Sequence, residues 1–357
     1  MTKRITLGSK AARPAADELP KPSLEHLERL TDDTGLMQHA KYIIPERLNG
    51  YCTDDNARAL VVITKYLKKH NEPQARKLFD IYLAFLYHSL KPDKTVHNFL
   101  EYNRNWRIDE PEHDTLGRAV WAFGTVIASS LNDNYLRFVK EFFGDTSNHI
   151  PSMPLRGAAY SIFGLYEFLT KFPKDKHILE LLTIAAERLA GNYKENSSAE
   201  WDWFEDILTY ANAILPAAMY TAARILNNRK YLDIAEKTCA FLLANTFNGK
   251  HFSFIGSNGW YPKGGRRAQF DQQCIEVSTT IIMLANAYQA TKNKEYLTLQ
   301  RKAFNWFLGE NDVHHSLYDT ETKGCCDGLG GEGVNVNQGA ESIISFLLAL
   351  LITEETA

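Results

Sequence analysis

The sequence predicts an all-α domain in which six helical hairpins close into an (α/α)6 toroid. Two observations predict this fold: a pattern that recurs six times along the chain, and amphipathic segments that separate its copies. The composition agrees, because 45% hydrophobic and 23% charged residues over 357 positions allow one large core without disulfides. We expect residues 1–22 to be a flexible tail and residues 23–357 to be the toroid.

The recurring pattern is a polar loop followed directly by a helix of small and apolar residues. Such helices are apolar nearly all round, which predicts burial on every side. We therefore expect an inner ring of helices that begin near residues 54, 114, 156, 208, 273 and 338. The prediction includes almost no sheet beyond one short hairpin around residues 251–260.

The segments between these helices have apolar residues at i, i+3 and i+4, as in ARKLFDIYLAFLYHSL and KHILELLTIAAERLAGNY. They predict an outer ring of helices with one face in solvent. An open helical solenoid is the alternative, but a solenoid would end in polar capping units. The last helix, SIISFLLALLIT, is instead among the most apolar in the chain, which favours closure of the ring. Its apolar run is too short for a membrane span, so we expect none.

Charge and cysteine content argue against several classes of function. The net charge of −3 includes no concentrated basic patch, so no nucleic-acid partner is expected. An odd count of five cysteines without repeated CxxC spacing fits a reducing, cytoplasmic location. Cys325 and Cys326 with His314 and His315 could bind zinc, but their spacing matches no closed zinc site. We expect no metal, and the glycines of GLGGEG follow no strand, so we expect no nucleotide cofactor.

The polar loops that begin the inner helices would share one rim if the ring closes, and that rim is the expected site. Its carboxylates, amides and aromatic residues suit a sugar, which offers an apolar face for stacking and hydroxyls for hydrogen bonds. Any one of the acids or amides could instead only cap its helix. The expected substrate-binding residues are Tyr51, Asp54, Arg58, Trp106, His113, Asp114, Arg118, Arg156, Trp201, Trp203, Asp206, Tyr210, Arg267, Asp271, Glu276, Asn337, Gln338 and Glu341.

Glycoside cleavage needs one protonated and one ionised carboxyl group. Asp55 lies at a helix N-terminus, which lowers the pKa of a carboxyl group, so we expect it to be the ionised catalyst. Glu205 lies beside Trp201 and Trp203, which we expect to serve as sugar platforms and as an apolar wall that raises the pKa of the acid.

Helices one and four of a six-membered ring are opposite each other. We therefore expect Asp55 and Glu205 to face each other across the central cavity, within the roughly 10 Å that an inverting or retaining mechanism allows. The alternative is that both carboxylates are structural and form buried ion pairs with Arg58 or Arg118.

The segments GYCTDDNARAL, WDWFEDILTYANAILP, FNWFLGEND and GVNVNQGAESIISFLLAL resemble a bacterial family of six-hairpin proteins. The resemblance spans from about His39 to the C-terminus. Members are found alone or joined to glycosyltransferase domains, so it implies an (α/α)6 toroid, glycan metabolism and a possible glycosyltransferase partner. Asp54 and Asp55 with Asn56 are also similar to the Asp-Asp pair of endo-mannanases that share this toroid. This sequence has Ala211 where members of the six-hairpin family often have Asp.

These features favour a glycan-processing enzyme, most directly a glycoside hydrolase acting on a carbohydrate substrate. A non-catalytic, carbohydrate-binding partner of a glycosyltransferase is one alternative. A sugar epimerase of the N-acylglucosamine type is another. That epimerase would need two opposed histidines on inner helices, and only His113 lies near such a position.

Overall fold

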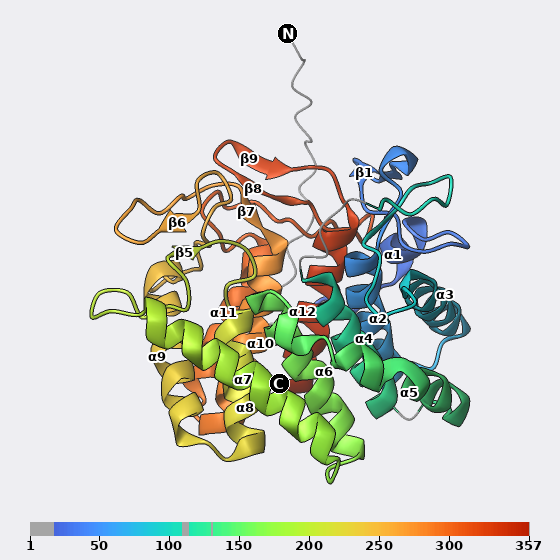
Figure 1. Ribbon diagram of the computed structural model, residues 1–357. Coiled ribbons are helices and arrows are strands. Elements are labelled where there is room, and N and C mark those ends of the chain that lie inside the picture. The colour runs from blue at the N-terminus through green and yellow to red at the C-terminus, as the bar shows by residue number, and fades with distance from the viewer. Residues whose placement is uncertain (1–17, 109–113, 130, 357) are drawn as a thin grey trace.

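The computed structural model describes residues 18–108, 114–129 and 131–356 (Figure 1). Within them, the inner ring consists of α2 (Thr53–Leu67), α4 (Thr115–Ser129), α6 (Leu155–Lys171), α8 (Ile214–Leu226), α10 (Cys274–Thr291) and α12 (Ala340–Thr356). Each of these helices packs against the next, and α12 packs against α2, so the ring is closed. The predicted toroid is confirmed. The predicted tail falls mostly outside the described residues and stays a prediction.

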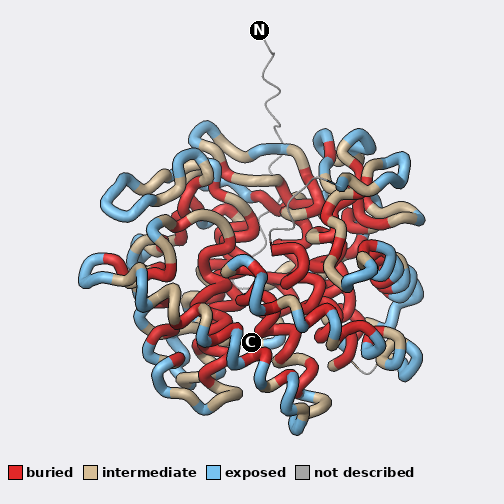
Figure 2. The backbone as a smooth tube through the Cα atoms, viewed as in Figure 1, coloured by how far each residue is buried: buried red, intermediate tan, exposed pale blue. Residues whose placement is uncertain are grey.

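The outer ring consists of helices that bury one face, as their amphipathic sequences predict. In α7, for example, Leu182, Ala185 and Leu189 are buried, and Figure 2 shows exposed backbone around a buried centre. None of the described helices is long and apolar enough to cross a membrane. The outer helices are α1 (Glu25–Arg29), α3 (Pro73–Ser89), α5 (Asp133–Ser147), α7 (Lys176–Asn196), α9 (Arg229–Thr246) and α11 (Glu295–Asn305), and the 3-10 turns are η1 (Arg47–Asn49), η2 (Ile150–Ser152) and η3 (Trp306–Leu308).

The fourth inner helix begins at Ile214, six residues later than the sequence predicts. Pro216 explains the difference, because proline has no N–H and is tolerated only in the first turn of a helix. A helix that began at residue 208 would place Pro216 in its interior. The preceding residues form the short strand β5 (Ile207–Leu208) and a turn in which Ala211 has a φ of 46°.

The sheets are small, antiparallel and close to the N-terminal ends of inner helices (Figure 1). Strand β3 leads directly into α2, and β7 leads directly into α10. The pairs are β1 (Ala40–Lys41) with β2 (Ile44–Pro45), β3 (Tyr51–Cys52) with β4 (Phe99–Leu100), β5 with β6 (Tyr261–Pro262), and a sheet of β7 (Gln272–Gln273), β8 (Gly328–Gly330) and β9 (Gly333–Asn335).

The prediction of a hairpin around residues 251–260 is wrong. That region contributes a single bridge between Phe247 and Phe252. Gly259 and Trp260 have φ values of 118° and 55°, which an extended strand cannot include. The chain turns there, and its next strand, β6, pairs with β5 instead.

Glycines set the distance between α4 and α6. Gly117 and Gly124 of α4 are seven residues apart, as are Gly157 and Gly164 of α6, so each pair lies on one helix face. A methyl group added at Gly117 would lie 2.1 Å from the carbonyl oxygen of Gly157, and one at Gly124 would lie 2.1 Å from that of Gly164. These helices therefore touch backbone to backbone.

We expect Gly124→Ala to lower the free energy of unfolding by about 1–3 kcal/mol, because the two helices must separate. Gly144→Ala in α5 is the matched control, since a methyl group there meets no atom within 4 Å. Alanine is the better helix former by up to about 1 kcal/mol, so the control should be neutral or stabilising. Chemical denaturation measures both variants. Equal effects of the two substitutions would refute the close-packing account.

Candidate functional site

The first two turns of α2 contribute two carboxylates and an arginine to a charged cluster. Arg58 donates from Nε to Asp54 Oδ1 at 2.9 Å and from Nη2 to Asp55 Oδ1 at 2.8 Å. Arg118 of α4 donates to the other oxygen of Asp54. Glu341 of α12 accepts from Arg58 Nη2 at 3.2 Å. Three neighbouring helices of the inner ring thus meet in one cluster of three acids and two arginines, hereafter the charged cluster.

The acids of the charged cluster are more accessible than its arginines. Both arginine side chains are 4% exposed, whereas Asp54 is 19% and Glu341 42% exposed. The guanidinium of Arg118 also lies over the ring of Tyr160, 4.7 Å from its centroid. A ligand that approached the cluster would therefore meet carboxylate oxygens first.

Asp55 is buried, and burial raises its pKa to about 6. Arg58 opposes this rise, and the acidic side chains of Glu341 and Asp327 add to it. The expectation that the helix N-terminus would keep this carboxyl group below its ordinary pKa is wrong, because loss of water has the larger effect. A carboxyl group with this pKa carries a proton in part of the molecules at neutral pH.

A second polar group lies around Arg156 of α6. Its guanidinium donates to Glu205 Oε1 at 2.9 Å and to Thr209 Oγ1 at 3.0 Å, while its Nε donates to the carbonyl oxygen of Tyr210 at 2.7 Å. The Tyr210 hydroxyl donates to Asp114 Oδ2 at 2.7 Å. This group connects the start of α6 with the segments that precede α4 and α8.

Glu276 in the first turn of α10 is buried and binds the turn before α8. Its carboxylate accepts from the backbone N–H of Ala211 and from Asn212 Nδ2, the latter at 3.1 Å. Burial raises the pKa of Glu276 to about 7, although these hydrogen bonds lower it. Residue 211 is the position at which the resembled family often has Asp. In this chain it is alanine, and its backbone binds the carboxylate of Glu276 from the neighbouring helix α10.

Glu276 should make stability depend on pH near neutrality. Its folded-state pKa of about 7 lies above the ordinary 4.5, so its contribution to stability is complete below pH 4.5 and is lost as pH rises through 7. The loss is on the order of 3 kcal/mol. We expect Glu276→Gln to reduce the fall in unfolding free energy between pH 5 and 8, measured by denaturant titration.

The exposed acid Asp206 supplies the control for this pH series, since Asp206→Asn should leave the wild-type slope unchanged. Asp55 also has a raised pKa and titrates in the same range, so part of the slope should survive in Glu276→Gln. An undiminished slope in that variant would show that Glu276 titrates in the folded state as it does in the unfolded chain.

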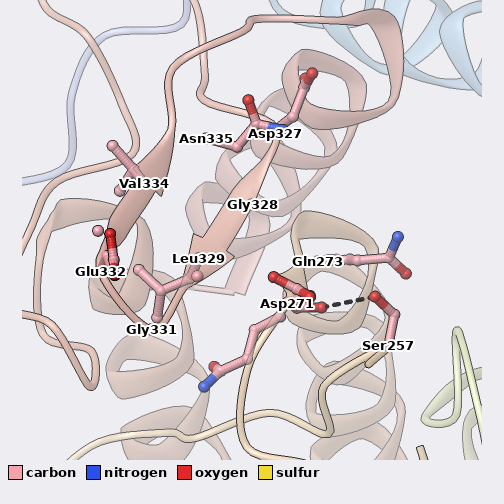
Figure 3. Close-up of a pocket in the computed structure, with 13 residues that line it drawn as sticks. Ser257, Asp271, Gln273, Asp327, Gly328, Leu329, Gly331, Glu332, Val334 and Asn335 are labelled. Atoms are coloured by element: carbon pink, nitrogen blue, oxygen red, sulfur yellow. Dashed lines mark hydrogen bonds between the residues drawn. The ribbon is translucent and has the colours of Figure 1, made fainter. Parts of the chain in front are cut away.

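A cavity of about 560 Å³ lies between the β7–β8–β9 sheet and the segment that precedes β7 (Figure 3). Figure 3 shows Ser257, Asp271 and Gln273 on one wall and residues 328–335 on the other. Asp327 lines the cavity and is close enough to Asp55 to raise the pKa of that group. One wall residue of the cavity, Asp327, therefore interacts electrostatically with Asp55 and Glu341 of the charged cluster.

The structure brings ten of the predicted residues into these two polar groups. They are Asp54, Asp55, Arg58, Arg118 and Glu341 in the charged cluster, and Asp114, Arg156, Glu205, Tyr210 and Glu276 around Arg156. Asp271 lines the cavity beside the β7–β8–β9 sheet. That Asp55 and Glu205 face each other stays a prediction.

The prediction that Trp201 and Trp203 form sugar platforms is wrong. Both are buried, and both pack against Phe241 of α9, at ring distances of 5.1 and 6.1 Å. The indole of Trp201 also donates to the carbonyl oxygen of Glu205 at 2.7 Å. These rings are core, and Glu205 pairs with Arg156 rather than standing among them.

Several other predicted residues serve the scaffold. Tyr51 is buried and donates to Asp32 at 2.6 Å, and Trp106 packs against Phe85 of α3. Asp206 is exposed beside Lys263. The others bind backbone or neighbouring loops, and His113 lies outside the described residues. The loop-binding residues are Arg267 on the Ser253 and Phe254 carbonyls, Asn337 on the N–H of Tyr42, and Gln338 on Thr322 and Asp319.

Sequence reasoning missed Asp327, Tyr160 and Asn212. Tyr160 follows Arg156 by four residues and so shares its helix face, which is a signal the sequence contains. Asp327 comes directly before the glycines of β8, but nothing local indicates that this loop folds back beside Asp55. Within the described chain, no cluster of three His, Cys, Asp or Glu side chains could hold a metal ion.

Comparison with known proteins gives structural matches. No family model matches the chain, and no curated protein matches it by sequence. A sugar epimerase from a ruminal bacterium has 9% identity and a TM-score of 0.72, covering 93% of this chain and 95% of that one. A D-mannose isomerase has 11% identity and a TM-score of 0.72, covering 93% and 94%.

A third match is an inactive variant of the GH76A α-1,6-mannanase of Salegentibacter sp. HEL1_6 in complex with α-1,6-mannotriose. It has 12% identity and a TM-score of 0.61, covering 93% of this chain and 97% of that one, and it carries two consecutive aspartates exchanged for asparagine. The similarity is one of fold. The predicted likeness to (α/α)6 sugar enzymes is confirmed at that level, and association with a glycosyltransferase stays a prediction.

Proposed function

We propose that the chain is a glycan-processing enzyme, specifically a glycoside hydrolase that uses Asp54 and Asp55. The observation that carries the proposal is the charged cluster, in which two adjacent carboxyl groups lie in different environments. Asp54 is bound by two guanidinium groups, whereas burial raises the pKa of Asp55 to about 6. Divergent environments for two carboxyl groups are what separate an acid from a base or nucleophile.

Each carboxyl group then has one role. Asp55 in its protonated form donates its proton to the glycosidic oxygen, so that the leaving sugar departs as a neutral alcohol. Asp54 is held ionised by Arg58 and Arg118, and it either attacks the anomeric carbon or removes a proton from the attacking water. Arg58 binds both acids, so it positions them relative to each other.

The mannanase with the same fold supports this choice of residues and a mannoside as first candidate substrate. That enzyme is inactive when two consecutive aspartates are replaced, and it binds mannotriose. Asp54 and Asp55 are consecutive here and lie at the start of an inner helix. The cysteines, all free, are consistent with a cytoplasmic enzyme, and a glycosyltransferase partner remains part of the proposal.

Glu205 is the alternative partner of Asp55, as the sequence predicts. Its pairing with Arg156 places it in the second polar group instead. Glu205→Gln distinguishes the two assignments, because it should leave hydrolysis largely intact if Asp54 and Asp55 are the pair.

A sugar epimerase is the second candidate, favoured by the TM-score of 0.72 with a protein of that activity. The inner helices contain no histidine within the bounds that the structure gives them. They therefore lack the two opposed histidines that an epimerase of the N-acylglucosamine type would need. Product analysis separates the candidates, because an epimerase changes the sugar without breaking a glycosidic bond.

The direct test is a panel of α- and β-linked mannosides, glucosides and galactosides, with products followed by chromatography. We expect one linkage to be cleaved with release of a reducing sugar. An epimerised product with all linkages intact would establish the second candidate, and binding without turnover would favour the non-catalytic partner.

A further inference from the structure

We propose that the chain has a second carbohydrate-binding site, at the end of the barrel opposite the charged cluster. A cavity of about 320 Å³ opens there, lined by side chains of α2, α4, α6, α10 and α12. Lys65 on its rim follows Asp55 by ten residues along α2, which corresponds to about 15 Å of helix. The cavity is therefore separate from the site proposed for hydrolysis.

The floor of this cavity is aromatic and apolar. Trp121 of α4 and Phe163 of α6 line it, with ring centroids 5.9 Å apart, and Ile282 and Ile352 complete it. Trp121 also stacks on Tyr160, with centroids 5.7 Å apart and an interplanar angle of 23°. These contacts hold the indole in place, and because Trp121 is 4% and Phe163 6% exposed, the floor offers only a narrow apolar surface.

The rim of the cavity is polar and organised by ion pairs and hydrogen bonds. Lys65 Nζ pairs with Glu355 at 3.2 Å across the mouth. Arg224 donates to Asn286 Oδ1 at 3.3 Å and to Gln289 Oε1 at 2.5 Å, which fixes both amides. With its oxygen bound in this way, Gln289 presents its NH₂ group as a donor.

Further acidic and basic groups on the rim decide the class of ligand. Glu167 and Lys68 line the cavity together with the Lys65 and Glu355 pair, so two acids and two lysines face one opening. An anion would meet the acids and a cation would meet the lysines. A neutral molecule with many hydroxyl groups can use all of these donors and acceptors at once.

A sugar matches both the polar rim and the apolar floor, because it has hydroxyl groups for the rim and an apolar face for the floor. A cavity of this volume is at the lower end of the range for small-molecule sites, which fits one or two sugar rings. The aromatic surface within reach of a sugar ring here is that of Tyr166, which is partly exposed, because Trp121 is almost as buried as Trp201 and Trp203. The site would hold a second part of a glycan, or a second glycan, away from hydrolysis.

The test is hydrogen–deuterium exchange of the full chain with mannose, glucose and galactose as probes. We expect one of them to slow exchange in residues 163–170 and 282–291 by about the factor 1 + [L]/Kd. Glu167→Ala combined with Gln289→Ala removes two rim groups and should abolish this slowing. A double Asp54→Asn and Asp55→Asn variant should keep it.

The inference is overturned if none of the three sugars slows exchange in these segments, or if the rim double variant retains the full effect. Hydrolysis serves as an independent readout, because the rim variant should cleave a small glycoside at the wild-type rate. If no glycoside is cleaved but the slowing occurs, the proposed function fails and the second site stands.

Discussion

Replacing Asp55 with asparagine is expected to lower the turnover of a cleavable glycoside by about 10²–10⁴-fold, the usual contribution of a positioned acid. The amide has no acidic proton to give to the leaving oxygen. Its oxygen can still accept from Arg58, so the charged cluster should stay assembled. Steady-state kinetics, with thermal unfolding of the same preparation, measure the effect.

Asp206→Asn is the matched control, because Asp206 is an exposed acid close to Glu205 in sequence and should change turnover little. A leaving group of low pKa needs less protonation, so an aryl glycoside should restore part of the lost rate in Asp55→Asn. If that variant cleaves unactivated glycosides at the wild-type rate, Asp55 is not the acid.

Replacing Arg58 with methionine is expected to destabilise the fold by about 3–5 kcal/mol, the usual effect of removing one partner from a buried ion pair. Asp55 would remain buried without its guanidinium partner, and Asp54 would keep only Arg118. Methionine preserves most of the side-chain volume, so a loss of packing contributes little. Denaturant titration at pH 7 measures the change.

Arg229→Met gives the comparison for a surface ion pair. Arg229 is 74% exposed and contacts Asp233 at 2.7 Å, so its replacement should change stability by less than about 1 kcal/mol. Lower pH should reduce the defect of Arg58→Met, because protonation removes the unpaired charge on Asp55. Similar effects in the two arginine variants would contradict the burial of the charged cluster.

The fold could be predicted because the inner helices differ from the outer ones in composition. A helix such as α12, apolar on every side, has to be surrounded, and six such helices define a ring. The start of α8 was missed because the polar residues before it suggest a cap, whereas Pro216 and the pairing of β5 with β6 decide where the helix begins. Such pairing depends on a segment more than 50 residues away.

The sequence predicts which residues gather in the two polar groups better than it predicts their protonation. Asp54, Arg58 and Arg118 lie within the first two turns of inner helices, which the sequence shows directly. The protonation of Asp55 depends on burial, and burial depends on how three helices meet. Local sequence contains no such information, and the helix-end effect alone predicts a shift of the pKa in the opposite direction.

The tryptophans also show that local sequence does not determine whether a side chain is buried. Trp201 and Trp203 lie in a polar segment, which suggested an exposed platform. Their rings are covered by Phe241 of α9, about 40 residues later in the chain. An aromatic residue in a loop is therefore a platform only if no distant element packs on it.

The most direct test of the central claim is a crystal structure of the Asp55→Asn variant with α-1,6-mannotriose, the ligand bound by the mannanase of the same fold. The account predicts a glycosidic oxygen within hydrogen-bond distance of the side chain at position 55, with Asp54 beside the anomeric carbon. A trisaccharide bound only elsewhere, with the charged cluster intact and untouched, would contradict it.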